Sequence, residues 1–303
     1  MVDPKNAKDK IELESQAYGC SLATSDRNFG KYLPIPIKRL WAGIGFLTKV
    51  PVPTWIAADT ESLSSSRPYF PAVGVIIGLG LALFDRLFTI LFPLPAACAL
   101  DLVLMFLITG GLHWDGVIDT FDGILGAHTR EDALRIMRDS RIGALGAITM
   151  VILLITKYGL LLSIPFVRLE AAGLIPCPRF QALMVSPVLA RWSMCLVMHV
   201  FPYARKEGGI GSLFIRGPRR EETCTEKLGS ILTNLILPGA FTLFCAVAIS
   251  GKRGAFAFLI CTLFSYLGGC KTSRFLNGLS GDTYGAVCEI SEIVALAAFC
   301  VHI

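Results

Sequence analysis

Long apolar stretches recur along the chain and restrict the folds that it can adopt. They cover residues 70–92, 96–111, 143–166, 182–201, 231–250, 255–269 and 289–303. Several approach the roughly 20 residues that a helix needs to cross a bilayer, and a chain that is 53% hydrophobic and 17% charged is too apolar for an ordinary soluble domain. Since backbone in contact with lipid must satisfy its own hydrogen bonds, these spans should be helices. The sequence therefore predicts an all-α, polytopic integral membrane helical bundle of about six or seven transmembrane helices.

Three of these stretches are weaker predictions than the others because of charge or length. Asp85 and Arg86 lie in the first stretch, Asp101 lies in the second, and the last stretch has only fifteen residues. Lys157 and Arg191 also fall inside spans. A charged residue within a span indicates a functional site by default, and Arg191, near the centre of its helix, needs a partner or a water-filled pocket.

Most of the 28 Lys and Arg residues fall on one side of the membrane when each is assigned to a loop of the seven-span arrangement. Because cytoplasmic loops carry the excess of basic residues, we expect a multi-pass protein of the cell (inner) membrane whose N-terminus and active site are cytoplasmic. The net charge of +5 is thus mostly a topology signal. No nucleic acid is expected as a partner, since no basic helix carries interleaved aromatic residues.

The first 30 residues differ in composition from the rest of the chain. They have mixed charge and lack the apolar core of a signal peptide, so residues 1–30 should form a mobile N-terminal extension and residues 31–303 a single integral-membrane domain. Residues 31–53 mix Trp41 with Lys38, a pattern typical of an interfacial helix. The ten cysteines include no CxxC pair, which favours free thiols.

Three aspartates follow one of the apolar stretches at helical spacing. In LHWDGVIDTFDG, Asp115, Asp119 and Asp122 are separated by four and three residues, so a helix places them on one face. Like charges crowded at a membrane boundary need compensation, and oxygen-only ligands favour magnesium that carries a substrate phosphate. His113 lies two residues before the first aspartate, where a structural or hydrogen-bonding role is expected. The alternative is a solvated acidic helix start, since acidic residues are common at helix N-termini.

The segment RIMRDSRIGALG follows on the same side of the membrane. Arg138, Asp139 and Arg141 crowd the end of a short amphipathic helix just before the chain returns to lipid. Arginine binds phosphate oxygens bidentately, so Arg138 and Arg141 are candidates for a diphosphate clamp. Earlier on this helix, Glu131 and Arg135 have the spacing of an ordinary salt bridge.

A second basic loop begins with FPYARKEGG. Here Arg205 and Lys206 are placed to hold a substrate phosphate. Attraction to anionic lipid heads explains the same residues, and the sequence leaves both readings open.

A third loop, LNGLSGDTYGAVCEISE, carries a second set of acidic residues. Asp282 or Thr283 is expected to cap the helix that follows. Glu289 and Glu292 lead into the last apolar span, so they should form a second acidic face at the membrane boundary.

Carboxylates that hold magnesium, arginines on the same surface and no Walker motif together indicate chemistry on a diphosphate without a soluble nucleotide-binding domain. Bridging of the diphosphate oxygens by a metal would neutralise the leaving group, and arginines would stabilise the charge that develops. The nucleophile would be the alcohol of a second substrate, with one carboxylate accepting its proton.

The motifs HWDGVIDTFDG, RIMRDSRIGALG, SPVLARWSM, FPYAR and GLSGDTYGAVCEISE resemble successive motifs of the cobalamin synthase family, the adenosylcobinamide-GDP ribazoletransferases. The resemblance runs from about Phe46 to Glu292. It implies a magnesium-dependent membrane transferase of the last steps of cobalamin biosynthesis, which joins adenosylcobinamide-GDP to alpha-ribazole or its 5'-phosphate and releases GMP. It also implies the lipid bilayer and other cobalamin-pathway enzymes as partners. Two positions depart from the family pattern: Arg138 replaces the usual lysine, and Ala190 replaces an expected glycine.

The residue patterns and the family resemblance together predict the residues of the site. The expected metal ligands are Asp115, Asp119 and Asp122. The expected catalytic residues are these three and Asp282. The expected substrate-binding residues are His113, Arg138, Asp139, Arg141, Arg191, Arg205 and Glu289.

Two other functions compete with this interpretation. An intramembrane prenyltransferase or a CDP-alcohol phosphotransferase also uses aspartates and magnesium, but the CDP-alcohol pattern DGxxAR has Asp119 and Thr120 in place of AR here. A secondary transporter would show ionisable pairs near the bilayer midplane and inverted repeats. The sequence shows no repeat and places its carboxylates at the ends of spans.

Overall fold

The computed structural model describes residues 33–53, 56, 59–166, 177–205, 210–214 and 224–301. The expected N-terminal extension and Lys206 lie outside these residues. The described part of the chain is helical, and its only strand-like pairing is an isolated parallel bridge between Tyr203 and Leu279. The all-α prediction is therefore confirmed.

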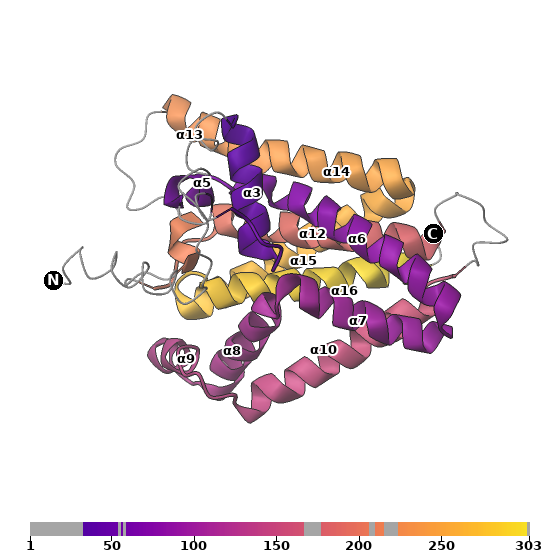
Figure 1. Cartoon of the computed structure of the whole chain (residues 1–303). Coiled ribbons are helices and arrows are strands. Elements are labelled where there is room, and N and C mark those ends of the chain that lie inside the picture. Colours follow the sequence, from indigo (N-terminus) through magenta and orange to yellow (C-terminus); the bar gives the residue numbers. More distant parts are fainter. Residues whose placement is uncertain are drawn as a thin grey trace.

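Figure 1 shows a bundle of long helices with shorter helices at its ends. The main helices of the bundle are α6 (Phe70–Leu91), α7 (Leu94–Thr109), α10 (Ala144–Ser163), α12 (Pro178–Val200), α14 (Leu237–Ser250), α15 (Lys252–Leu276) and α16 (Gly281–Cys300). The other α-helices are α3 (Ile35–Leu47), α5 (Thr60–Ser64), α8 (Leu112–Gly126), α9 (Arg130–Ile136) and α13 (Cys224–Ile231). A π-helical turn, Leu232–Ile236, joins α13 to α14. Six helices are long and apolar enough to span a membrane, or up to seven if α7 and α8, bent by 92°, form one span. Six or seven spans were predicted.

Helix α12 forms the centre of the bundle. Most of its residues are buried, and it packs against α6 and α16 (Figure 1). The contact with α6 is close because α6 presents Gly74 and Gly78: a Cβ added at Gly74 would lie 2.6 Å from the carbonyl oxygen of Pro187. Small residues at such positions let helix backbones approach in a membrane. By contrast, most residues of α10, α14 and α15 are not buried within the bundle, which leaves them as the lipid-facing layer.

Asp85 and Asp101, the acidic residues within the first two predicted spans, are buried and form ion pairs. The guanidinium of Arg179, near the start of α12, donates to Asp85 on α6 at 2.7 Å and to Asp101 on α7 at 2.6 Å. It also donates to the carbonyl of Leu161 on α10. One side chain thus joins four helices, and the ion pairs explain how these spans tolerate acidic residues.

Segments far apart in sequence meet at one end of the bundle. Arg130 on α9 donates to the carbonyls of Leu276 at 2.7 Å and Ala204 at 2.8 Å, and the Tyr203–Leu279 bridge joins the same two loops. The three loops predicted to share a side of the membrane therefore do share one end of the bundle. One local prediction was wrong: Arg135 pairs with Asp132 at 3.0 Å rather than with Glu131, which pairs with Arg130 at 3.3 Å.

Helix α16 begins eight residues before the apolar stretch that predicted it. Its N-cap is Ser280, whose hydroxyl accepts from the Thr283 amide while the Thr283 side chain accepts from the Ser280 amide. The sequence predicted a cap by Asp282 or Thr283; Thr283 takes part in this capping box, but the N-cap itself is Ser280. Because the helix starts early, Glu289 and Glu292 are buried inside the bundle, and the prediction that they form an acidic face at the boundary was wrong.

Candidate functional site

A pocket of about 200 Å³ lies where α8 and α16 meet the 201–205 loop. Its polar lining is His113, Asp115, Arg205 and Asp282, together with Tyr203 and Tyr284. Its apolar lining is Phe46, Leu112, Met194, Met198 and Phe214. Four of the residues expected in the site are thus brought together from distant parts of the chain. The pocket aromatics were not among the expected residues, although Tyr203 and Tyr284 belong to the quoted motifs FPYAR and GLSGDTYG.

Close packing of α8 against α16 creates the pocket. A Cβ added to Gly116 would lie 2.6 Å from the carbonyl oxygen of Asp282, and one added to Gly285 would lie 3.2 Å from the backbone of His113. Glycine at position 116 is required for this approach, and a Cβ at position 285 would be tightly packed against α8. The two helices therefore hold Asp115 and Asp282 at the rim of one pocket.

Asp282 and Arg205 form an ion pair at the edge of this pocket. Nη2 of Arg205 donates to Oδ2 of Asp282 at 2.5 Å and to the carbonyl of Met137 at 3.4 Å. The hydroxyl of Ser280 donates to the same carboxylate oxygen at 3.4 Å. Charge-assisted bonds of this kind fix the direction of both side chains. The pair thus places one acid and one cation where a phosphate can reach both.

The aspartates of α8 have different surroundings. Asp115 is exposed at the pocket, and Asp119 is partly buried one turn further along. Asp119 lies within electrostatic range of the carboxylates of Asp115 and Asp282, with Arg205 as the counter-charge. Acidic side chains from α8 and α16 therefore share one negative region.

Asp122, unlike Asp115, makes hydrogen bonds that hold two helices together. Its two carboxylate oxygens accept from the amides of Gly143 and Gly146, each at 2.8 Å, and so anchor the first turn of α10 to α8. Gly143, the N-cap of α10, has no side chain to cap these amides. A carboxylate at a helix N-terminus also interacts favourably with the helix dipole. Asp122 thus substitutes for the missing cap.

Asp122→Ala is expected to lower the free energy of unfolding by about 1–3 kcal/mol, because two backbone amides lose their acceptor in a buried place. Reversible unfolding in mixed detergent and SDS micelles measures the change. Asp119→Ala is the matched control on the same helix, and it should change stability much less. Equal effects of the two substitutions would contradict the anchoring role.

His113 is buried beside the pocket and has a free ring nitrogen. Its Nε2 finds no hydrogen-bond partner among the described residues, and neither does the hydroxyl of Tyr284. Buried polar groups normally have partners, so a ligand that reached these two atoms would supply a hydrogen bond that the described residues do not. Tyr203 lies outside the spans on the loop after α12, and burial raises the pKa of its phenol.

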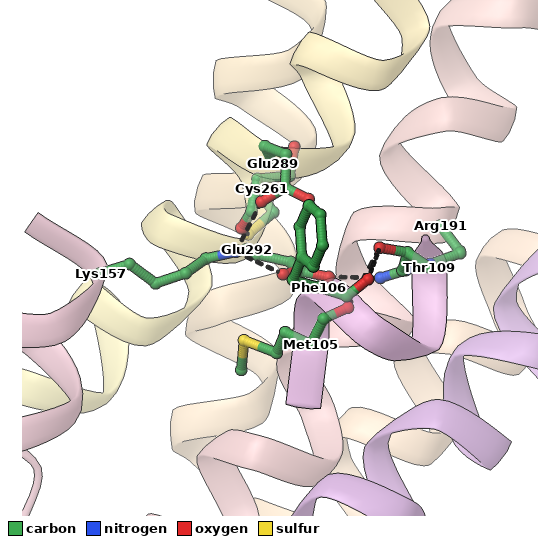
Figure 2. Close-up of polar contacts among 9 residues, drawn as sticks. Met105, Phe106, Thr109, Lys157, Arg191, Cys261, Glu289 and Glu292 are labelled. Atoms are coloured by element: carbon green, nitrogen blue, oxygen red, sulfur yellow. Dashed lines mark hydrogen bonds and ion pairs between the residues drawn. The ribbon is translucent and has the colours of Figure 1, made fainter. Parts of the chain in front are cut away.

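Two more of the expected residues, Arg191 and Glu289, belong to a buried ionic network behind His113. Lys157 donates to Glu289 at 2.6 Å and to Glu292 at 2.7 Å, and its ammonium lies 4.8 Å from the ring centroid of Trp114. Figure 2 shows Lys157 and Arg191 approaching Glu292 from opposite sides. The partner that Arg191 was expected to need is therefore Glu292. The two cations and two acids balance, so the network carries no net charge.

The segment expected to form a diphosphate clamp lies at the surface. Arg141 pairs with Asp139 at 2.7 Å, and its hydrogen bonds lower the pKa of that carboxyl to about 2. Arg138 is exposed and acts electrostatically on Tyr203 in the pocket wall. None of the three is among the residues lining the pocket, so any contact with substrate occurs outside it.

The described residues contain no group of three or more His, Cys, Asp or Glu side chains arranged to hold a metal ion. The aspartates of α8 are therefore not a preformed three-ligand site. The eight cysteines whose side chains the structure describes are free, as predicted.

Comparison with known proteins assigns the chain to a family. Residues 39–300 match the family model described as cobalamin-5-phosphate synthase. Relatives named adenosylcobinamide-GDP ribazoletransferase include the protein of Desulfitobacterium hafniense strain Y51, 35% identical over 86% of this chain and 95% of its own. The protein of the same name from Geotalea daltonii is 31% identical over 86% and 96%, and that of Escherichia coli strain UMN026 is 32% identical over 86% and 98%. No solved structure matches the chain significantly. The chain belongs to the cobalamin-5-phosphate synthase family.

Proposed function

We propose that this protein is a transferase of the last steps of cobalamin biosynthesis, which joins adenosylcobinamide-GDP and alpha-ribazole, or its 5'-phosphate, and releases GMP. The relatives that this chain matches over almost their whole length are named adenosylcobinamide-GDP ribazoletransferase, which supports this function. The structural observation that carries the proposal is the meeting of Asp115, Asp282 and Arg205 at one pocket. These groups are the acids and the cation that displacement at a diphosphate requires.

In the proposed reaction, a ribose hydroxyl of alpha-ribazole attacks the phosphorus that is bonded to cobinamide. The bond from this phosphorus to the bridging oxygen breaks, and GMP leaves with that oxygen. The hydroxyl proton goes to a carboxylate, for which we propose Asp282, held in place by Arg205 and Ser280. Arg205 then donates to the diphosphate oxygens as negative charge develops on them.

Magnesium remains a proposal, and its fit rests on the donors present. Asp115 and Asp119 supply hard carboxylate oxygens one helical turn apart, whereas both oxygens of Asp122 already accept backbone amides. Magnesium is commonly held by one or two carboxylates together with substrate phosphates and water, so a preformed group of three protein ligands is not required. When bound, the ion would neutralise charge on the diphosphate. We therefore propose Asp115 and Asp119 as its ligands and Asp122 as the anchor of their helix.

We also propose that the site faces the cytoplasm of a cell whose inner membrane holds the protein. The basic loops and the pocket occupy one end of the bundle, which supports a common side. Association with other cobalamin-pathway enzymes remains a prediction.

The secondary-transporter alternative gains one of its expected features, because Lys157, Glu289 and Glu292 form ionisable pairs inside the bundle. Each acid there is already paired with a cation, however, so neither is open to a coupling ion. The family assignment also favours the transferase.

Purified full-length protein in lipid nanodiscs, supplied with adenosylcobinamide-GDP and alpha-ribazole, should release GMP in equal amount to the cobalamin formed. We expect release to require magnesium and both substrates. GMP release without alpha-ribazole would indicate hydrolysis instead, and no release in the presence of magnesium would contradict the proposed function.

Arg205→Ala is expected to lower kcat/KM for adenosylcobinamide-GDP by about ten- to a hundredfold, because hydrogen bonds to charged groups contribute about 1.5–3 kcal/mol. Steady-state kinetics at saturating alpha-ribazole measures this loss. Arg135→Ala, which removes an exposed arginine that pairs on the surface of α9, is the control and should leave kinetics unchanged. An Arg205→Ala enzyme with normal kcat/KM would remove Arg205 from the reaction.

A further inference from the structure

We infer that the pocket beside Asp115 and Asp282 receives the planar, apolar base of the acceptor nucleoside, while the diphosphate lies outside it at the end of the bundle. The inference rests on the proposed function, since it chooses between the two substrates of that reaction. The base of alpha-ribazole is a dimethylbenzimidazole, a flat bicyclic ring with no exocyclic polar group.

The size of the pocket excludes most of either substrate. Its volume is about 200 Å³, below the roughly 300–1,000 Å³ of pockets that hold a whole drug-sized ligand. A bicyclic ring with part of its ribose fits such a volume, whereas a corrin ring does not. The corrinoid must therefore remain outside, on the surface next to the pocket.

The pocket wall is suited to an apolar aromatic ring. The ring of Phe214 packs edge-on against Phe70 at a centroid distance of 5.4 Å, and its centroid lies 4.8 Å from that of Phe46. Phe46 and Phe214 both line the pocket, so part of its wall is aromatic. Met194 and Met198 from α12 line the pocket as well. Methionine sulfur is polarizable and makes favourable contacts with aromatic rings.

Polarity separates the benzimidazole from guanine, the other bicyclic base in the reaction. Guanine carries an amide and an amino group, and each would need a hydrogen-bond partner when buried among methionine and phenylalanine side chains. Benzimidazole needs a partner only at its ring nitrogen. Nε2 of His113 and the hydroxyl of Tyr284, which have no partner among the described residues, could form the few hydrogen bonds that the base or its ribose requires.

The position of the charges agrees with this arrangement. Helices α8 and α16 place Asp115 and Asp282 at the pocket, and Asp282 holds Arg205 there. A base bound against Phe214 would leave the ribose hydroxyls near the carboxylates, where the proposed proton acceptor lies. A diphosphate bound against Phe214 and the methionines, away from Arg205 at the edge of the pocket, would instead place its charge among apolar side chains, which is costly.

Binding to the unaltered protein tests the inference without requiring turnover. In equilibrium dialysis with the full-length protein in nanodiscs, alpha-ribazole should bind in the absence of adenosylcobinamide-GDP. Free 5,6-dimethylbenzimidazole should displace it, and guanosine should not. Displacement by guanosine but not by dimethylbenzimidazole would overturn the assignment, as would the absence of any ribazole binding.

Phe214→Ala should weaken ribazole binding by about tenfold or more, the loss typical of a removed base-stacking side chain. It should raise KM for alpha-ribazole and leave KM for adenosylcobinamide-GDP within twofold. Phe258→Ala, which truncates an aromatic stacked on Trp192 outside the pocket, is the matched control and should do neither. Met198→Ala provides a second pocket variant with the same expected selectivity.

The two proposals fail separately in these experiments. Suppose that the protein binds ribazole, that Phe214→Ala weakens this binding, and that no GMP is released. This result would refute the transferase function but support the pocket assignment. GMP release in which both pocket variants raise KM for the GDP substrate alone, or for both substrates equally, would refute the pocket assignment and keep the transferase.

Discussion

Asp115→Asn is expected to lower the turnover of the purified protein by about a hundred- to a thousandfold, the loss typical when one electrostatic contact to a transition state is removed. The substitution keeps the size of the side chain and removes its charge. Since Asp115 is exposed at the pocket and forms no ion pair with the described residues, folding should not change. The magnesium concentration for half-maximal GMP release should also rise, because one of two proposed ligands is weakened.

Asp132→Asn is the matched control for this variant. Asp132 is an acidic residue of α9 that pairs with Arg135 at the surface, outside the pocket. Its substitution should leave both turnover and the magnesium dependence as they are. Normal activity of Asp115→Asn at the magnesium concentration that half-saturates the unaltered protein would contradict the proposed ligand role.

Lys157→Met is expected to lower the free energy of unfolding by about 3–5 kcal/mol, the usual result of removing one partner from a buried ion pair. Lys157 is fully buried and donates to Glu289 and Glu292. Glu292 keeps Arg191 in the variant, but Glu289 loses its only described side-chain partner. Unfolding in mixed SDS and detergent micelles measures the loss.

The double variant Lys157→Met with Glu289→Gln separates charge from packing. It removes the unpaired acid together with the cation, so it should recover a large part of the stability that Lys157→Met loses. Retention of full stability by Lys157→Met would show that the network contributes little. Failure of the double variant to recover any stability would point to lost side-chain packing rather than to the stranded acid.

The sequence predicted the spans and the end of the bundle that holds the site, because these follow from local patterns. Apolar length predicted α6, α10, α12 and α14, and spacings of four and three placed the aspartates on one face of α8. The pairing of loops at one end followed from the distribution of basic residues, which depends only on the order of the spans.

The different roles of those aspartates could not be predicted, since they depend on distant backbone. Asp122 became an anchor only because the start of α10 lies beside it and begins at Gly143, a residue without a capping side chain. The spacing on α8 is the same whether or not α10 is there. A tertiary contact therefore decided which carboxylates remain for a ligand.

The start of α16 was misjudged for a related reason. The sequence placed Glu289 and Glu292 at the membrane boundary because a hydropathy pattern treats every charged residue as unpaired. Their partners, Lys157 and Arg191, lie on α10 and α12, more than 90 residues earlier in the chain. Once the acids are paired they are tolerated inside the bundle, and the helix extends back to Gly281.

The buried ionic network also sets an order for biogenesis. A chain is made from its N-terminus, so α10 and α12 enter the bilayer with Lys157 and Arg191 before the acids of α16 have been synthesised. Nascent chains that stop before residue 281 would leave two cations in lipid without the counter-charges of α16, which is a costly state. Arrival of α16 neutralises both cations at once, so the last helix to be translated locks the earlier ones in place.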